Sequence, residues 1–268
     1  MTALQLSPTR LGRVMEALLG LTELQRLYAR RQPGCFAEQA LRLLNIDVTI
    51  EGDAASIPAE GPVVIVANHP GGAVDGLALL ATVRRRRSDV KLLANSLLRR
   101  LPDLRDEVIA VNPFRPADPD DVRGLREARR WLAAGGALIM FPAGEVSSVT
   151  EDGTVVDSSW HAGVLALAHW TSASVVPVFI HGQNRAIVRA AGRIHPLLRS
   201  ALLIRELLAH RGTTLALSIG AAVSAERLAR IGDKPARLAY LRARVYALRR
   251  PARLQGRRPI LGATTGSG

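Results

Sequence analysis

The residues best suited to chemistry form one turn, Asn68-His69-Pro70-Gly71-Gly72-Ala73-Val74-Asp75-Gly76, which directly follows the apolar run Val63–Ala67. Histidine is the side chain best suited to accept a proton near neutral pH. A carboxylate within reach can fix its tautomer and stabilise the imidazolium that forms. The two central glycines allow the backbone to approach a ligand closely. The turn therefore predicts a general base, His69, oriented by Asp75, and the alternative is a purely structural turn with a hydrogen-bonded histidine.

The spacing of the pair constrains its local geometry. His69 and Asp75 lie six positions apart in the sequence, and an ideal helix turns about 240° over that distance. On a regular helix the two side chains would point to different sides, so they meet only if part of the segment is irregular. Pro70-Gly71-Gly72 supplies such a stretch. We expect the helix to begin near Ala73 or Val74, with the dyad formed across the loop before it.

The surrounding pattern predicts an α/β fold with a mostly parallel sheet covered by helices, because short apolar runs alternate with helical patterns from residue 46 onward. Active sites in such sheets lie at the carboxyl ends of the strands, which is where His69 falls. The predicted strands are Ile46–Ile50, Val63–Ala67, Val90–Ala94, Val108–Val111, Ala137–Phe141, Val175–Ile180 and Thr214–Ile219. The predicted helices are Ala73–Arg86, Asp121–Ala134, Trp160–Thr171, Pro196–His210 and Pro235–Leu248.

The two ends of the chain differ from this alternating pattern. Residues 1–45 predict an N-terminal helical hairpin packed on the main domain, built from an amphipathic helix over Leu11–Arg31 and a second stretch over Ala37–Leu44. A helix lying on a membrane is the alternative for the first of these. Residues 46–250 form the predicted main domain, and residues 251–268 predict a disordered basic tail.

The net charge of +13 is almost entirely arginine, because Lys91 and Lys234 are the only lysines. Clusters stand at Arg84–Arg87, Arg99-Arg100, Arg129-Arg130, Arg249-Arg250 and Arg257-Arg258. Such a balance suits an anionic partner, with an ordinary solvated surface as the alternative. The clusters lack the aromatic side chains on which nucleic-acid bases stack. We therefore expect an anionic membrane surface or a phosphorylated carrier as partner, and no specific nucleic acid.

Cysteine usage and hydropathy argue against several other classes. Cys35 is the single cysteine, which rules out an internal disulfide framework and fits a reducing compartment. No cysteine and histidine cluster has the spacing of a zinc site, so we expect neither a metal nor a tightly held cofactor. No run of about 18 apolar residues predicts a spanning helix, and the N-terminus lacks a signal-peptide pattern. These patterns predict a cytoplasmic protein.

Three further segments follow or interrupt predicted strands. Asn112-Pro113-Phe114-Arg115 follows the predicted strand Val108–Val111. Phe141-Pro142-Ala143-Gly144-Glu145 begins at the last residue of the predicted strand Ala137–Phe141. Pro177 stands inside Val175–Ile180 and cannot donate a ladder hydrogen bond, which predicts an edge strand or a bulge. Each segment alone is ordinary loop chemistry.

In their order, the four segments resemble the motif blocks of the lysophospholipid acyltransferase superfamily, which includes the glycerol-phosphate and lysophosphatidate acyltransferases. His69 and Asp75 match the histidine–aspartate block, with one residue more than the usual H-x4-D. This longer form, N-H-P-x-G-x-x-D-G, resembles the bacterial hemolysin-like branch, some of whose members O-acylate lyso-ornithine or lyso-glycine lipids. The resemblance implies a glycerol-phosphate acyltransferase-like fold. It also implies direct transfer from acyl-carrier protein or acyl-CoA to a lysolipid hydroxyl, with the enzyme peripheral to the inner membrane.

The resemblance implies binding roles as well. The residues expected to line the donor or acceptor pocket are Gly71, Gly72, Asn112, Phe114, Arg115, Phe141, Pro142, Gly144 and Glu145. Backbone N–H groups at the two glycines of the turn would stabilise the oxyanion. The third block departs from the family's F-P-E-G-T-R, because Ala143 replaces its glutamate and its arginine is absent. Since those residues help to bind the acceptor's phosphate, a simple glycerol-phosphate acceptor is disfavoured, and Arg115 is the candidate substitute.

Two other functions stay open from the sequence. A non-catalytic protein on the same scaffold would hold anionic lipid or nucleic acid on its basic faces, and its affinity would fall steeply with salt. An acyl thioester or ester hydrolase would use water as the acceptor. A covalent serine route has no support, because the chain has no G-x-S-x-G elbow.

Overall fold

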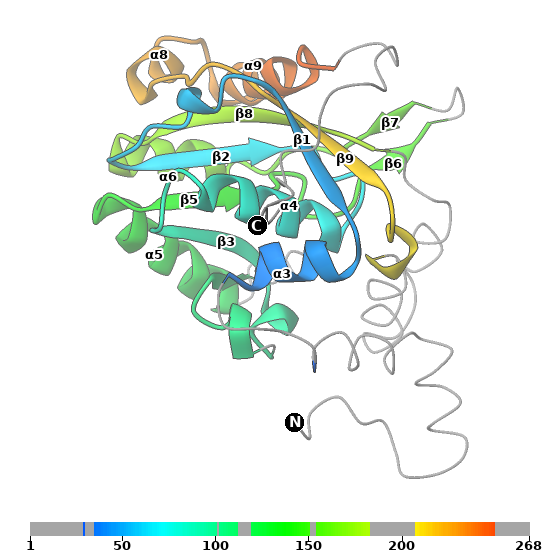
Figure 1. Ribbon diagram of the computed structural model, residues 1–268. Coiled ribbons are helices and arrows are strands. Elements are labelled where there is room, and N and C mark those ends of the chain that lie inside the picture. Colours follow the sequence, from blue (N-terminus) through cyan, green and yellow to red (C-terminus); the bar gives the residue numbers. More distant parts are fainter. Residues whose placement is uncertain are drawn as a thin grey trace.

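The computed structural model describes residues 29, 35–100, 102–111, 119–150, 154–182 and 207–249. A seven-stranded sheet forms the centre of the molecule, in the order β1-β9-β8-β2-β5-β3-β4 (Figure 1). Every neighbouring pair is parallel except β8 and β9, which are antiparallel. The strands are β1 Asp47–Gly52, β2 Val63–Ala67, β3 Val90–Asn95, β4 Val108–Val111, β5 Ala137–Met140, β8 Ser174–His181 and β9 Thr214–Ile219. The predicted α/β fold with a mostly parallel sheet is confirmed.

Helices cover both faces of this sheet. On one face lie α3 (Phe36–Leu43) and α4 (Ala73–Arg84). The helices on the other face are α5 Pro119–Ala133, α6 Gly163–Thr171, α8 Ala225–Ala229 and α9 Lys234–Tyr246. The short elements are the 3₁₀ turns η2 Ala54–Ser56, η3 Ser96–Arg100 and η4 Pro102–Leu104, and the antiparallel hairpin of β6 Ser148–Val149 and β7 Val155–Val156.

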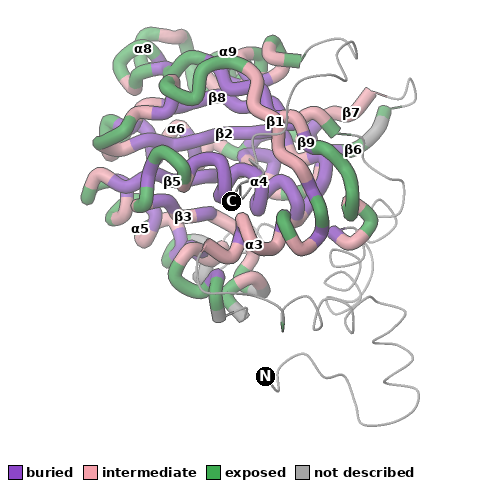
Figure 2. The backbone as a smooth tube through the Cα atoms, viewed as in Figure 1, coloured by how far each residue is buried: buried purple, intermediate pink, exposed green. Residues whose placement is uncertain are grey.

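The central strand β2 shows why its sequence is apolar throughout. All five residues are buried (Figure 2), and their side chains alternate between the two layers of the core. Val63, Ile65 and Ala67 pack with α3 and α4. Val64 and Val66 pack with the helices of the other face. Because helices cover both sides of the strand, neither set of side chains can be polar.

Pro177 is not on an edge strand, so that part of its prediction is wrong. Strand β8 lies between β9 and β2. The Pro177 carbonyl accepts from the N–H of Gly220 at 2.9 Å, so its nitrogen faces the same side. The antiparallel pairing of β8 with β9 ends at Val178↔Ile219, and the next pair along β8 is Val175↔Val223. Two residues of β8 therefore stand opposite three residues of the segment that follows β9. Pro177, which has no backbone N–H to donate, therefore lies at an irregularity of the bulge type, which was the alternative prediction.

Several predicted segments lie outside the described residues. These are the helix over 11–31 apart from residue 29, the tail over 251–268 and most of the helix over 196–210, of which residues 207–209 are helical. The predicted stretch over 37–44 corresponds to α3, which contacts α4. The proposed domain boundaries stay predictions.

Candidate active site

Asn68 fixes the point at which the chain leaves β2. Its side-chain nitrogen donates to the Ile180 carbonyl at 3.0 Å, and its side-chain oxygen accepts from the Ile180 N–H at 2.7 Å. The amide therefore takes the place of one residue of the ladder between β2 and β8. Because Asn68 is buried and both of its polar atoms are satisfied, the next residue, His69, starts from a fixed position.

His69 and Asp75 meet as the sequence predicted. Nδ1 of His69 lies 2.9 Å from Oδ2 of Asp75, whose side chain is completely buried in the first turn of α4. The Gly71 N–H donates to the same oxygen at 2.7 Å. A carboxylate that accepts from Nδ1–H leaves Nε2 as the acceptor nitrogen of a neutral imidazole. Nε2 forms no hydrogen bond with the described residues, and the His69 side chain is 17% exposed.

The glycines of the turn make this contact sterically possible. Gly72 caps α4 with φ of +62°, a conformation that favours glycine. A Cβ on Gly71 would lie 2.7 Å from Oδ1 of Asp75 and 2.8 Å from Cγ1 of Val74. The expectation that both N–H groups are available to an oxyanion is wrong for Gly71, because its N–H is used by Asp75. The Gly72 N–H makes no hydrogen bond within the described part of the chain.

The segment after β5 brings Phe141 onto the histidine. The strand ends at Met140, one residue earlier than predicted, and the Phe141 ring leaves the sheet to stack on His69. Their centroids lie 3.9 Å apart, with an angle of 16° between the ring planes. Pro142 is buried, and its carbonyl accepts from the His161 N–H at 2.8 Å.

The other predicted pocket residues fall into two groups. Gly144, with φ of +72°, closes a turn onto the Phe141 carbonyl. Glu145 is exposed, and it makes no hydrogen bond or ion pair with the described residues. Asn112, Phe114 and Arg115 lie outside the residues that the structure describes.

Sequence reasoning missed a buried polar cluster behind His69. The His69 carbonyl accepts from the Ser147 N–H at 2.8 Å, and the His69 N–H is shared between Oγ of Ser147 (3.2 Å) and Oδ1 of Asp157 (3.3 Å). Ser147 and Asp157 lie 78 and 88 residues from His69 along the chain, in a loop that reads as ordinary polar sequence. Nothing in the local pattern marks either residue.

The Arg84–Arg87 cluster is largely structural and does not form a continuous basic surface. Arg84 pairs with Glu107 at 2.7 Å, while burial raises the pKa of the Glu107 carboxyl in spite of that guanidinium. Arg86 donates to the Ile57 carbonyl at 2.7 Å. Arg85 is the exception, because it is exposed and makes no hydrogen bond with the described residues.

Arg87 is the most completely bonded member of this cluster. It is buried and pairs with Asp89 through two hydrogen bonds of 2.6 and 2.8 Å. Its remaining donors bind the carbonyls of Pro58, Gly61 and Gly135, at distances from 2.6 to 3.2 Å. This guanidinium therefore joins three loops at the end of the sheet opposite to His69. Neutralising it would damage the fold before it changed any binding to anions.

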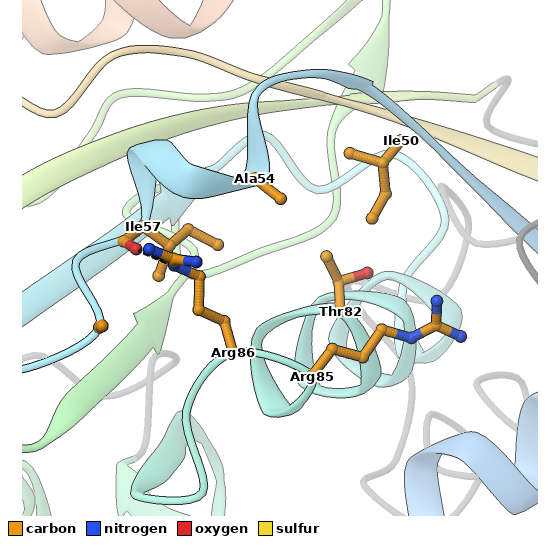
Figure 3. A pocket seen from close by; sticks show the side chains of 7 residues that line it. Ile50, Ala54, Ile57, Thr82, Arg85 and Arg86 are labelled. Atoms are coloured by element: carbon orange, nitrogen blue, oxygen red, sulfur yellow. Dashed lines mark hydrogen bonds between the residues drawn. The ribbon is translucent and has the colours of Figure 1, made fainter.

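A cavity of about 320 Å³ lies near the C-terminal end of α4 (Figure 3). Its walls are Ile50, Ala54, Ile57, Ala59, Thr82, Arg85 and Arg86. In the figure, Arg86 extends toward Ile57 and Arg85 extends away from it. Asp75 is in the first turn of α4 and Arg85 follows the last, about 15 Å further along the axis. The cavity is therefore separate from the dyad.

Among the described residues, no three histidine, cysteine, aspartate or glutamate side chains are grouped as metal ligands would be. No described helix combines the length and apolar character needed to span a bilayer.

Comparisons with known proteins give the family. The model of the acyltransferase family matches residues 20–262. A lyso-glycine lipid O-acyltransferase of Phocaeicola vulgatus is 29% identical over 193 residues, which cover 69% of this chain and 67% of that protein. A lyso-glycine lipid O-acyltransferase of Bacteroides thetaiotaomicron is 29% identical over 150 residues, which cover 56% of this chain and about half (53%) of that relative.

The fold has a solved counterpart. The crystal structure of the 1-acyl-sn-glycerophosphate acyltransferase from Thermotoga maritima superposes with a TM-score of 0.54 at 21% identity, covering 88% of this chain and 91% of that one. This likeness concerns the fold alone. The family match spans most of the sequence, so the chain belongs to the acyltransferase family, as the resemblance of its four motifs to the lysophospholipid acyltransferase superfamily predicted.

Proposed function

We propose that this enzyme transfers a fatty acyl group from an acyl thioester to the hydroxyl of a lysolipid with an amino-acid head group, such as lyso-glycine or lyso-ornithine lipid. The observation that carries the proposal is the His69–Asp75 contact of 2.9 Å, with Nε2 left as a free acceptor among the described residues. The names of the two relatives support the acceptor class.

In the proposed reaction, Nε2 of His69 takes the proton of the acceptor hydroxyl as that oxygen attacks the thioester carbonyl. Asp75 stabilises the imidazolium through Nδ1–H. The tetrahedral intermediate then collapses, the carbon–sulfur bond breaks, and the leaving thiolate takes the proton back from Nε2. A lysolipid and an acyl thioester thus give an acylated lipid and a free thiol, without an acyl-enzyme. General-base catalysis of this kind contributes about 10²–10⁴-fold in rate.

Two neighbours of the dyad take supporting roles in this proposal. The Phe141 ring stacks on the imidazole, and an aromatic face favours the charged form that develops during proton transfer. The Gly72 N–H, next to the dyad and at the start of α4, is the candidate donor to the oxyanion. Gly144, Glu145 and Pro142, with Asn112, Phe114 and Arg115, would line the rest of the donor and acceptor pocket.

The absent phosphate ligands support an acceptor without a glycerol-phosphate head group. Ala143 and Val146 stand where the third motif of the superfamily has its glutamate and its arginine. Neither position presents a charge, because alanine and valine are apolar; Ala143 is buried and Val146 is half-buried. A phosphate at this place would lack its bidentate partner.

The outer face of α5 supports the proposed anionic partners: acyl-carrier protein or acyl-CoA as donor, and an anionic membrane surface. Four arginines are exposed along this helix: Arg123, Arg126, Arg129 and Arg130. The guanidinium of Arg129 lies 5.5 Å from the centre of the Trp170 ring, which is 52% exposed on the neighbouring helix α6. Arginine beside an exposed tryptophan suits the interface of an anionic bilayer. We propose that the enzyme acts at the cytoplasmic face of the inner membrane.

The test is a transfer assay with purified protein and a labelled acyl donor, supplied both as acyl-carrier protein and as CoA thioester. The acceptors are lyso-glycine lipid, lyso-ornithine lipid, lysophosphatidate and a control without acceptor. The proposal predicts labelled diacyl product with an aminolipid acceptor and little or none with lysophosphatidate. Label released as free fatty acid at the same rate with and without acceptor would instead identify a hydrolase.

A further inference from the structure

The carboxylate of Asp157 forms the centre of the buried cluster behind His69. Oδ1 accepts from the Ser147 hydroxyl at 2.6 Å and from the His69 N–H at 3.3 Å. Oδ2 accepts from Nε1–H of Trp160 at 2.9 Å. Asp157 is 4% exposed and Ser147 is 1% exposed, so these bonds form away from solvent.

All three groups that point at the carboxylate are donors. A carboxylate accepts at both oxygens, so it satisfies two N–H groups and one O–H group together. A carboxamide of the same shape cannot, because its NH₂ group would face one of these donors. The site thus distinguishes a carboxylate from a carboxamide in a way that packing alone would not require.

The hairpin of β6 and β7 sets the register of this cluster. Ser148 pairs with Val156 and Val149 with Val155, which places Ser147 and Asp157 opposite each other at the base of the hairpin. Ser147 holds the carbonyl of His69 with its N–H, and its Oγ shares the His69 N–H with Asp157. Both backbone polar groups of the histidine are therefore fixed by residues at the base of this hairpin.

Asp157 also joins the active-site turn to α9, the last described helix. The Asp157 N–H donates to the hydroxyl of Tyr246 at 2.7 Å, and Nη2 of Arg242 donates to the Asp157 carbonyl at 2.8 Å. Both partners belong to α9, and the Arg242 guanidinium lies over the Tyr246 ring at 5.4 Å. Helix α9 packs on β8 and α6, so the cluster is braced against the core.

We propose that Asp157 is a positioning residue for the reaction: it orients Ser147 and the main chain of His69 so that the imidazole stays aligned with Asp75. Its hydrogen bond to His69 is with the main-chain N–H, whereas the imidazole pairs with Asp75. This inference rests on the proposed function for its kinetic consequence, while its structural content, the alignment of the ring, can be measured without any substrate.

The test variant is Asp157→Asn in the full-length chain, with two comparisons. Ser147→Ala removes the hydroxyl that links Asp157 to His69. Ser148→Ala removes an exposed hydroxyl of the same hairpin whose acceptor is the Val156 carbonyl, outside the cluster, and it serves as the matched control. Thermal unfolding of each variant establishes that it folds. The kcat and KM for the acyl donor are measured separately, since misalignment of a base lowers kcat while leaving donor binding in place.

The second readout is the histidine imidazole ¹H–¹⁵N spectrum of protein labelled at its six histidines. The Nδ1–H signal of His69 is assigned by its absence in His69→Ala. In folded Asp157→Asn we expect kcat to fall about 10- to 100-fold, with KM within about threefold, as for a small displacement of a catalytic group. The Nδ1–H signal should broaden or disappear. Ser147→Ala should show the same changes, and Ser148→Ala should resemble wild type.

A folded Asp157→Asn protein that keeps both kcat and the Nδ1–H signal would overturn the proposal. So would a loss of kcat with an unchanged signal, because Asp157 would then act by another route. If Asp157→Asn does not fold, the same two measurements on Ser147→Ala decide in the same way. If wild type shows no transfer, the proposed function fails, but the comparison of spectra still tests the alignment.

Discussion

The carboxylate of Asp75 lies 2.9 Å from Nδ1 of His69, although the two residues are six positions apart. The contact exists because the chain is not helical between them: α4 begins only at Ala73, after a glycine with φ of +62°. Asp75 therefore enters from the first turn of a helix, and His69 from the end of the central strand. The central strand and the helix α4 thus hold the two groups of the dyad.

Replacing Asp75 with asparagine should leave the fold intact and impair transfer severely. A carboxamide can still accept from Nδ1–H, but it cannot stabilise the imidazolium as a carboxylate does. We expect kcat to fall about 10²–10⁴-fold, measured by initial rates with saturating donor. An Asp75→Asn enzyme within threefold of wild type would remove the carboxylate from the mechanism.

Replacing Gly71 with alanine should displace Asp75. The new Cβ would lie 2.7 Å from Oδ1 and 2.8 Å from Cγ1 of Val74, which forces the turn to move. We expect a loss of activity of about 10²-fold, because a displacement near 1 Å has that effect on oriented groups. Gly163→Ala at the start of α6 is the control: its nearest neighbour would be 3.8 Å away, so its activity and thermal midpoint should stay near wild type. Equal activity of the two variants would contradict the steric argument.

Phe141→Leu should lower kcat by about 2- to 30-fold, the range of about 0.5–2 kcal/mol for an aromatic face against a cation. Leucine keeps an apolar side chain in that space but removes the ring that stacks on His69 at 3.9 Å. Phe179→Leu is the matched control, because that ring packs on Tyr246 and not on the dyad. It should reduce stability more than kcat. A Phe141→Leu enzyme with wild-type kcat would show that the stack has no catalytic effect.

The parts of the fold that hydrophobic patterning controls were predictable. Three strands, β2, β4 and β9, have the predicted bounds, since each is a short apolar run. The prediction for Pro177 was wrong only in its edge alternative, because the residue lies in the interior strand β8, beside the bulge-type irregularity that was the other alternative. A break in the neighbouring ladder removes the need for its N–H, and no local pattern reveals what a strand pairs with.

The site was predictable where its residues are close in sequence. His69 and Asp75 are joined by one turn, so their types and the glycines between them indicate the contact. Asp157 reaches His69 from 88 residues away, by way of a hairpin whose two strands have two residues each, and its local sequence is that of a surface loop. The structural role of Arg87 was missed for a related reason. A run of four arginines indicates an exposed charge cluster, whereas the partners of Arg87 include carbonyls from loops distant in sequence.

Arg87→Ala should destabilise the protein strongly, whereas Arg85→Ala should not. Arg87 is buried and donates five hydrogen bonds to the half-buried Asp89 carboxylate and three half-buried carbonyls, so its loss leaves these acceptors without their donor, at a cost of about 1–3 kcal/mol in unfolding free energy. Arg85 is exposed, and its removal should change that energy by about 0.5 kcal/mol or less. Urea unfolding at pH 7 measures both. Similar values for the two variants would contradict the structural role of Arg87.

The same pair should give a defined pH dependence. The hydrogen bond from Arg87 lowers the pKa of the Asp89 carboxyl, so Asp89 binds protons less readily in the folded protein. Its contribution to stability is complete above the ordinary carboxyl pKa, about 4, and is lost as pH falls through the lowered value. The difference in unfolding free energy between wild type and Arg87→Ala should therefore narrow below about pH 4. A difference that is constant from pH 7 to pH 3 would show that the ion pair does not contribute.

The most direct test of the central claim is transfer of a labelled acyl group to lyso-glycine lipid by His69→Ala, run beside wild type. Nε2 of His69 is the proposed base, so the account predicts that the variant forms no diacyl product above background while its circular dichroism and thermal midpoint match those of wild type. Transfer by a folded His69→Ala protein at a rate near that of wild type would contradict the account.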